Sequence, residues 1–460
     1  MTTPNSSPAN APLVACAEAA AVVAFSCGAP VTLAQFLSDV AYVAAALPDS
    51  GHILNGCANR YHFTVGLLAA AVSGRISVLP STYAPETIRQ LQEGTPDVCC
   101  LHESDLDIAL PKVLFPALPE ITAATLPAGV TVPCIPLNQR VVTVFTSGTT
   151  GFSVGHHKTW GSLVEGARSE ATRLGLDRNG PYTLVGTVPP QHMYGLESTI
   201  MLGLHGRVAM SADRPFYPQD IASSLRAIPR PRLLVTSPVH LRAFLASGIA
   251  TPPVDMILCA TAPLPLALAE DAERRLGAPL YEIYGATEAG QIASRRPVAD
   301  PAWHLLPGLN LDHEGDQFWV RGGHVQVPAL LNDVIEPQGA QHFLLHGRGT
   351  DVINVAGKRS SLVFLEQQLL SIPGVTDAAF YMPEESSTGP VARLIAFAVA
   401  PGLNPDAIGE ALRGRIDPAF LPRPLYLVEM LPRLPTGKLP IAALQQLAAT
   451  LSQGTGIGDG

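Results

Sequence analysis

Hydrophobic and polar positions follow two alternating periods along the first third of the chain, and these periods predict helices and strands in turn. A helix is expected over 31–47, because apolar side chains recur on one face, Thr32 can cap the first turn and Pro48 ends it. The next expected elements are a strand at 53–54, a helix over 61–72 and a strand over 76–80. This alternation predicts an α/β fold with a largely parallel sheet, and the proline-rich stretch 111–136 is expected to be a connector.

After this connector, an apolar, β-branched run from Val141 to Phe145 predicts a buried strand that breaks abruptly into hydroxyl side chains and glycines. Glycine lets the backbone approach a ligand, and Ser and Thr add donors to the backbone N–H groups, so the loop suits phosphate oxygens. It is not a Walker A loop, because no Gly-Lys-Ser/Thr follows. A turn without ligand is the alternative interpretation. The candidate phosphate-binding residues are Thr146, Ser147, Gly148, Thr149, Thr150 and Gly151.

Three later strands are predicted to end in residues able to contact a ligand. One runs over 232–236 into Ser237, and another runs over 256–259 into Ala260, Thr261 and Ala262. The third runs through Tyr281 into Tyr284, Gly285, Ala286, Thr287 and Glu288. Ligands of α/β sheets gather at the carboxyl ends of strands. For the first two of these strands, ordinary α/β turns without a ligand are the alternative interpretation.

Composition limits the class of protein. At 460 residues the chain exceeds the roughly 250–300 residues of one core, so two or more domains are expected. The net charge of −9 argues against nucleic acid or an anionic membrane as a general partner. No apolar run reaches the ~18 residues of a membrane span, and the polar N-terminus lacks a secretory signal. Seven cysteines without a metal-binding spacing suggest reduced thiols, so a cytoplasmic location is expected.

Four segments, in order, resemble the signature motifs of the adenylate-forming enzymes: acyl- and aryl-CoA synthetases, peptide-synthetase adenylation domains and firefly luciferase. These segments are Thr146–Gly151, Tyr284–Glu288, His346–Arg359 and Leu431–Leu439. The resemblance implies an α/β fold, with a large N-terminal domain of mixed, mainly parallel sheets flanked by helices and a small mobile α+β C-terminal domain. The expected divisions are a core over 1–348, a hinge at 349–350, a lid domain over 351–450 and a disordered tail over 451–460.

The resemblance also implies roles for the nucleotide-binding residues. Tyr284 would stack on adenine beside Gly285, with the segment Ala260, Thr261 and Ala262 next to the base. Thr287 would bond the α-phosphate, and Glu288 would coordinate Mg²⁺. Asp333 and Arg348 would hold the ribose, although the Thr-Gly-Asp motif of the family keeps only its Asp here. The chain would pivot at Gly349 and Thr350, where family members often carry Asp or Lys.

Lysines and histidines mark further positions. Lys158 stands four residues later than the usual phosphate-loop lysine and would neutralise the β- and γ-phosphates. Its His-Lys-Trp setting resembles a short subgroup of acyl-AMP ligases, some of which load carrier proteins. His156 and His157 lack further ligands at a metal-binding spacing, so they are expected in a surface turn. Lys438, one of only four lysines, matches the lysine that enters the site to meet the carboxylate and α-phosphate.

The segment Pro189–Gly195 resembles the Pro-x-x-His-x-x-Gly motif that borders the carboxylate pocket, so His192, Gly195 and Ser237 are expected on the acyl side. The function implied is an ATP- and Mg²⁺-dependent ligase that activates an aryl or fatty acid as acyl-AMP and transfers it to CoA or to a carrier-protein phosphopantetheine. The alternative is a catalytically idle adenylate-binding protein of the same fold. A P-loop kinase or ATPase is disfavoured, because neither Walker A nor a kinase motif set is present.

Overall fold

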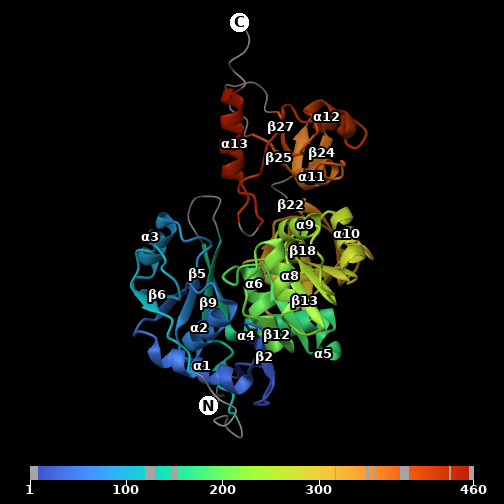
Figure 1. The fold of residues 1–460 in the computed structure, drawn as a ribbon. Helices are drawn as coiled ribbons and strands as arrows, with labels where there is room; N and C mark the ends of the chain where they lie inside the picture. Colours follow the sequence, from blue (N-terminus) through green and yellow to red (C-terminus); the bar gives the residue numbers. More distant parts are fainter. Residues whose placement is uncertain are drawn as a thin grey trace.

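The computed structural model describes residues 9–119, 130–146, 154–315, 317–348, 352–355, 358–383, 393–434 and 437–454. It has a large N-terminal part and a small C-terminal part that sits at one end of it, coloured orange to red (Figure 1). This confirms the predicted fold class, with a large α/β part and a small α+β part.

Two large sheets form the N-terminal part. The first, in the order β10-β9-β5-β4-β6-β7, is parallel except for β10, which pairs antiparallel with β9. Its strands are β4 (His52–Asn55), β5 (Ile76–Leu79), β6 (Val98–His102), β7 (Lys112–Leu114), β9 (Arg140–Thr146) and β10 (Val154–Thr159).

The second sheet, in the order β21-β22-β17-β16-β15-β14-β13-β11-β12-β2-β3, is parallel from β15 to β2 and antiparallel at both ends. Its strands are β2 (Val22–Ser26), β3 (Ala29–Thr32), β11 (Tyr182–Gly186), β12 (Val208–Ser211), β13 (Arg232–Thr236), β14 (Met256–Cys259), β15 (Leu280–Ala286), β16 (Gly290–Arg295), β17 (Trp303–Leu305), β21 (Asp333–Pro337) and β22 (His342–Arg348).

The remaining strands form smaller sheets. Near the N-terminus β1 (Asn10–Pro12) pairs with β8 (Cys134–Pro136), and a three-stranded sheet joins β18 (Leu309–Glu314), β19 (Gln317–Gly322) and β20 (Val325–Leu331). The C-terminal part contains β23 (Val352–Val355), β24 (Lys358–Ser361), β25 (Asp377–Tyr381), β26 (Ile395–Val399) and β27 (Leu425–Leu427).

Helices cover the sheets and join them. The helices of the N-terminal part are α1 (Leu33–Ala46), α2 (Arg60–Val72), α3 (Pro85–Gly94), α4 (Trp160–Leu174), α5 (Leu176–Asn179), α6 (Met193–Gly195), the π-helix Leu196–Met201, α7 (Leu202–His205), α8 (Pro218–Arg226), α9 (Pro238–Ala246) and α10 (Leu266–Leu276). Both α2 and α4 contact strands of the two large sheets, so the main core lies between the sheets, around buried Phe36, Phe63 and Trp160. The C-terminal part adds α11 (Leu362–Leu370), α12 (Pro405–Arg413), the 3₁₀ helix Pro418–Phe420 and α13 (Ile441–Gly454).

The predicted helix over 31–47 is confirmed as α1, and the Thr32 hydroxyl accepts a hydrogen bond from the Gln35 N–H at 3.3 Å. The strands expected at 53–54 and 76–80 and the helix expected over 61–72 are also present, as β4, β5 and α2. Local patterns were sufficient for these elements, because each has a regular apolar face or a clear cap.

Three local predictions were wrong. The connector over 111–136 carries two short strands, β7 and β8, at its ends. His156 and His157 lie in strand β10 and not in a turn, because pairing with β9 extends this segment. The predicted tail over 451–460 begins in a helix, since α13 continues to Gly454; residues 455–460 lie outside the described part of the chain.

Candidate functional site

The turn between β15 and β16 carries Glu288, and Lys158 supports it from the other sheet. The Lys158 ammonium donates a hydrogen bond to the Glu288 backbone carbonyl at 2.9 Å, and only 7% of this lysine is exposed. The Glu288 side chain itself is exposed. Strand β10 therefore brings Lys158 to the predicted metal-binding turn, where the ammonium contacts the backbone of the turn and not the Glu288 carboxylate.

Gly285 allows this turn to form. An ideal Cβ at residue 285 would lie 2.5 Å from the Gly290 carbonyl oxygen, closer than any side-chain carbon can approach. A glycine is therefore required where β15 passes against the start of β16. Gly285 is predicted to lie beside the adenine. Close packing inside the turn is a second reason for a glycine at this position.

Tyr284 and Asp333 are joined by a hydrogen bond from the phenol to the Asp333 Oδ2 atom at 2.5 Å. The Tyr284 ring lies 5.7 Å from that of Trp303 and 5.9 Å from that of Phe343, centroid to centroid, so its position is well packed on one side. Asp333 begins β21 and pairs in register with Arg348 of β22. The predicted adenine and ribose residues therefore meet at one place; the Arg348 side chain lies outside the described part.

The Lys438 loop lies over the carboxyl ends of β13 and β14. An ideal Cβ on Gly437 would be 3.7 Å from the Thr261 hydroxyl oxygen and 3.8 Å from that of Ser237. Thr261 has a positive φ of 83°, which non-glycine residues adopt rarely and mostly at functional sites. The small domain thus places Lys438, which is exposed, next to the strand ends that the sequence predicted as ligand-binding.

His192 lies at the same end of the sheet. Burial, and then the positive charges of Lys438 and Arg214, lower the pKa of His192 to about 4, so its imidazole is neutral at pH 7. A neutral ring is suited to contact an uncharged or anionic ligand without adding charge. Gly195, three residues later, is buried with an ideal Cβ only 2.0 Å from the Pro189 carbonyl oxygen, so its place depends on close packing.

The carboxyl groups of Glu170 and Glu197 are buried behind the Glu288 turn, and the sequence analysis identified neither of them. Burial raises the pKa of Glu170 to about 8 and that of Glu197 to about 7, with Lys158 opposing the rise at Glu197. The Ser198 hydroxyl donates to Glu170 Oε1 at 2.7 Å, and the Gln291 amide donates to the Ser198 oxygen at 2.7 Å. A signal existed in the sequence: each Glu interrupts an otherwise apolar helical face.

Several residues that the sequence predicts in the site are not described by the structure. Ser147 to Gly151 of the phosphate loop and the hinge residues Gly349 and Thr350 lie outside the described residues, as does the side chain of Thr146. Among the described residues, the contacts join the predicted residues in three groups: Lys158 with the Glu288 turn, Tyr284 with Asp333, and the Lys438 loop with Ser237 and Thr261.

The described residues contain no cluster of three or more His, Cys, Asp or Glu side chains able to hold a metal ion. Mg²⁺ bound to a nucleotide needs only one or two protein carboxylates, since phosphates and water supply the rest. The exposed Glu288 side chain fits that requirement. In the part of the chain that the structure describes, no helix is long and apolar enough to cross a membrane. All seven cysteines are free thiols.

The fold is that of the adenylate-forming enzymes. Residues 14–308 match the family model described as AMP-binding enzyme, and the chain belongs to this family.

Three of the curated relatives are named as acid–CoA ligases. The chain is 30% identical to 4-coumarate–CoA ligase of Rhodobacter capsulatus over half of its own length and 57% of that protein. It is 23% identical to 2-succinylbenzoate–CoA ligase of Bacillus licheniformis, over 70% of this chain and 73% of the relative. The human mitochondrial malonate–CoA ligase is 22% identical over 84% of this chain and 81% of the relative.

Solved structures with this fold span almost the whole chain. The ATP-bound MatB from Rhodopseudomonas palustris has a TM-score of 0.77 at 16% identity, covering 94% of this chain and 97% of the other. The o-succinylbenzoate CoA synthetase of Bacillus subtilis, solved with its acyl-adenylate, has a TM-score of 0.74 at 18% identity, over 92% and 95%. The large and small domains of this chain thus follow the architecture of adenylate-forming enzymes.

Proposed function

We propose that the protein is an ATP-dependent ligase that activates a carboxylic acid as acyl-AMP and then transfers the acyl group to a thiol. The observation that carries the proposal is the position of the Lys438 loop against Ser237 and Thr261. The neighbouring strand β15 leads to the Tyr284–Asp333 pair and to the Glu288 turn. A cation, a neutral imidazole and a nucleotide-binding pair at one place suit an acid meeting ATP.

In the first half-reaction a carboxylate oxygen attacks the α-phosphorus of ATP, the bond to the β-phosphate oxygen breaks and pyrophosphate leaves. Tyr284 and Asp333 would hold the base and the ribose. Lys438 would stabilise the negative charge shared by the carboxylate and the α-phosphate, and Thr287 would donate to that phosphate. Mg²⁺, held by Glu288, would neutralise charge on the phosphates.

In the second half-reaction a thiol sulfur attacks the acyl carbon, AMP leaves with the bonding electron pair, and the thiol proton passes to solvent. The small domain would first rotate about residues 349–350 and withdraw Lys438. CoA is the acceptor that the names of the relatives favour. The phosphopantetheine arm of a carrier protein is the second candidate, favoured by the late position of Lys158 after the phosphate loop.

The acid is an aryl or fatty acyl acid in this proposal, and the free cysteines suit the reducing cytoplasm. The test is pyrophosphate release with benzoates, hydroxybenzoates, cinnamates and fatty acids of increasing length, each without thiol, with CoA and with a carrier protein bearing its arm. Release that depends on one class of acid is the expected result. The added thiol that yields a thioester identifies the acceptor.

The competing function is an idle adenylate-binding protein. The displaced phosphate-loop lysine and the incomplete Thr-Gly-Asp motif favour it. ATP binding without acid-dependent pyrophosphate release, across the whole panel, would support this alternative and contradict the ligase.

A further inference from the structure

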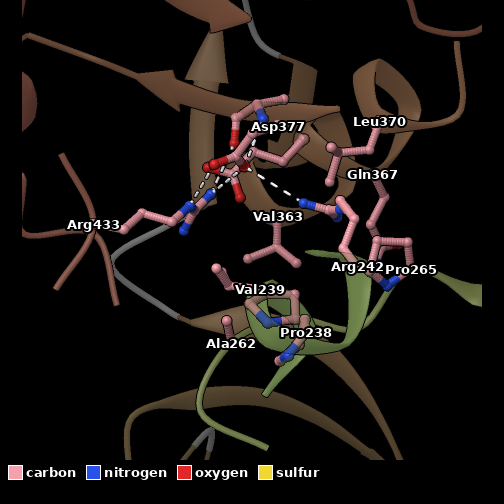
Figure 2. A pocket seen from close by; sticks show the side chains of 13 residues that line it. Pro238, Val239, Arg242, Ala262, Pro265, Val363, Gln367, Leu370, Asp377 and Arg433 are labelled. Carbon is pink, nitrogen blue, oxygen red and sulfur yellow. Dashed lines mark hydrogen bonds and ion pairs between the residues drawn. The ribbon is translucent and has the colours of Figure 1, made fainter. Parts of the chain in front are cut away.

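A small cavity lies between the two domains, beside the strand end that carries Ala262 (Figure 2). From the large domain it is lined by α9 and by residues 262–265, and from the small domain by α11, β25 and Arg433. Its walls are mostly apolar, but one edge carries three charged groups. These are Arg242 of α9, Asp377 at the start of β25, and Arg433, which precedes the Lys438 loop by a few residues.

Arg433 connects the body of the small domain to the Lys438 loop. Its Nε and Nη2 atoms donate to the two carboxylate oxygens of Asp377, each at 2.8 Å, in a bidentate pair. Its Nη1 atom donates to the Gly437 carbonyl oxygen at 3.0 Å, one residue before Lys438. The Leu434 N–H also donates to the Lys438 carbonyl at 2.8 Å, so the loop is closed on itself and held by one guanidinium.

The same Asp377 carboxylate also lies near a cation of the large domain, Arg242. Arg242 Nη1 lies 3.9 Å from Asp377 Oδ1, and Figure 2 shows Asp377 between the two guanidinium groups. Side-chain exposure is low for all three groups, at 25% for Arg242, 20% for Asp377 and 18% for Arg433. Burial lowers the pKa of Arg242, and Asp377 opposes this effect, so the carboxylate compensates for the lost hydration of Arg242.

Glu366 of α11 also lines the cavity and faces these guanidinium groups. It accepts a hydrogen bond from the Phe380 N–H at 3.2 Å. Burial lowers the pKa of Arg433, but the hydrogen bond and charge of Asp377 and the charge of Glu366 outweigh this effect, so the pKa of Arg433 is raised. Two carboxylates and one guanidinium of the small domain thus lie beside the Arg242 guanidinium of the large domain. The charges balance, which permits their partial burial when the domains meet in this arrangement.

We propose that Arg242, Asp377 and Arg433 form a latch that favours the domain arrangement with Lys438 in the site, and that Arg433 is the positioning residue of the Lys438 loop. This inference rests on the proposed function, because it assigns the latch to the adenylate-forming half-reaction alone. The Arg242–Asp377 attraction exists only when the domains meet this way, so it shifts the equilibrium between arrangements. Once the small domain rotates, the latch is open and contributes nothing to thioester formation.

The test compares two half-reactions in the full-length protein. Arg242→Gln is expected to slow acid-dependent pyrophosphate release about 3- to 5-fold, the upper range for the loss of one partly exposed ion pair. Thioester formation from supplied acyl-AMP should stay within about twofold of wild type, because the latch is open in that step. Arg242→Lys keeps the positive charge, so this variant should retain most of the wild-type rate of acid-dependent pyrophosphate release. Arg433→Gln should slow the first half-reaction more than Arg242→Gln does, since it also releases the Lys438 loop.

The matched control is Arg230→Gln. Arg230 also pairs with a carboxylate, that of Asp255, but both residues belong to the large domain. It should change neither half-reaction. Equal losses in both half-reactions of Arg242→Gln, or no loss in either, would overturn the latch.

Small-angle X-ray scattering gives a second readout that needs no activity. Arg242→Gln should shift the scattering profile away from that of wild type, whereas Arg230→Gln should not. Identical profiles for wild type and Arg242→Gln would contradict the latch even in an inactive protein. Absence of pyrophosphate release from wild type would instead count against the proposed function, so the two failures are distinguishable.

Discussion

The Tyr284 hydroxyl donates a hydrogen bond to Oδ2 of Asp333 at 2.5 Å, so the residue expected to stack on adenine also orients the carboxylate expected to hold the ribose. Hydrogen bonds to a carboxylate are short and strong. We expect Tyr284→Phe to raise the KM for ATP about 3- to 10-fold, because Asp333 loses this orienting donor. The measurement is the ATP dependence of acid-dependent pyrophosphate release.

Tyr61→Phe is the matched control, since Tyr61 also donates to an aspartate, Asp39, at 2.5 Å but within the core. This control should lower the thermal stability and leave the KM for ATP unchanged. The same KM for ATP in wild type and Tyr284→Phe would show that the pair plays no part in nucleotide binding.

Lys438→Ala should reduce the rate of adenylate formation by about 100-fold or more, because a preorganised positive charge is removed from the reacting oxygens. Thioester formation from supplied acyl-AMP should remain largely intact. Lys112→Ala removes an exposed lysine of β7 and should affect neither step. A comparable loss of both half-reactions in Lys438→Ala would contradict the role of a lysine that acts in one domain arrangement.

Lys158→Met should destabilise the protein and should also raise the concentration of Mg²⁺ and ATP that pyrophosphate release requires. The Glu288 carbonyl loses its 2.9 Å donor, and buried Glu197 loses its nearby cation. We expect the free energy of unfolding to fall by about 1–3 kcal/mol, the range for an unsatisfied buried polar group. Chemical denaturation and the Mg²⁺ dependence of pyrophosphate release measure the two effects. Unchanged stability would show that the buried ammonium contributes nothing to the turn.

Glu170→Gln should make stability less sensitive to pH. The folded-state pKa of Glu170 is raised to about 8 by burial, so the folded protein holds this proton more tightly than the unfolded chain does. The resulting stabilisation is fully present below the ordinary glutamate pKa of about 4.5 and is lost as pH rises through about 8. The difference in the free energy of unfolding between Glu170→Gln and wild type should therefore grow in favour of the variant by about 4 kcal/mol from pH 5 to pH 9.

The control for this effect is Glu165→Gln, on the exposed face of the same helix. Its thermal unfolding should follow the wild-type pH profile. Parallel profiles for Glu170→Gln and wild type from pH 5 to pH 9 would show that Glu170 ionises normally in the fold.

Much of the fold and part of the site could be predicted because their signals are local. Thr32 precedes an apolar helical face, and the cap it predicts is present. The strand expected through Tyr281 and Tyr284 is rich in aromatic and branched residues and is followed by turn residues, and it is present as β15 (Leu280–Ala286). In contrast, His156 and His157 carry no strand signal of their own. Their segment is extended because β9, a separate strand, supplies the pairing partner.

The sequence by itself determined the order of the motifs, the nucleotide-binding chemistry they imply and the family to which the chain belongs. Only the tertiary structure decided that Lys158 is buried beneath the Glu288 turn and that Arg242 meets Asp377 across the domain boundary. The physical reason is the range of the interactions. A cap or an apolar period involves residues within a few positions, whereas burial and charge pairing depend on which distant segments the packed core brings together.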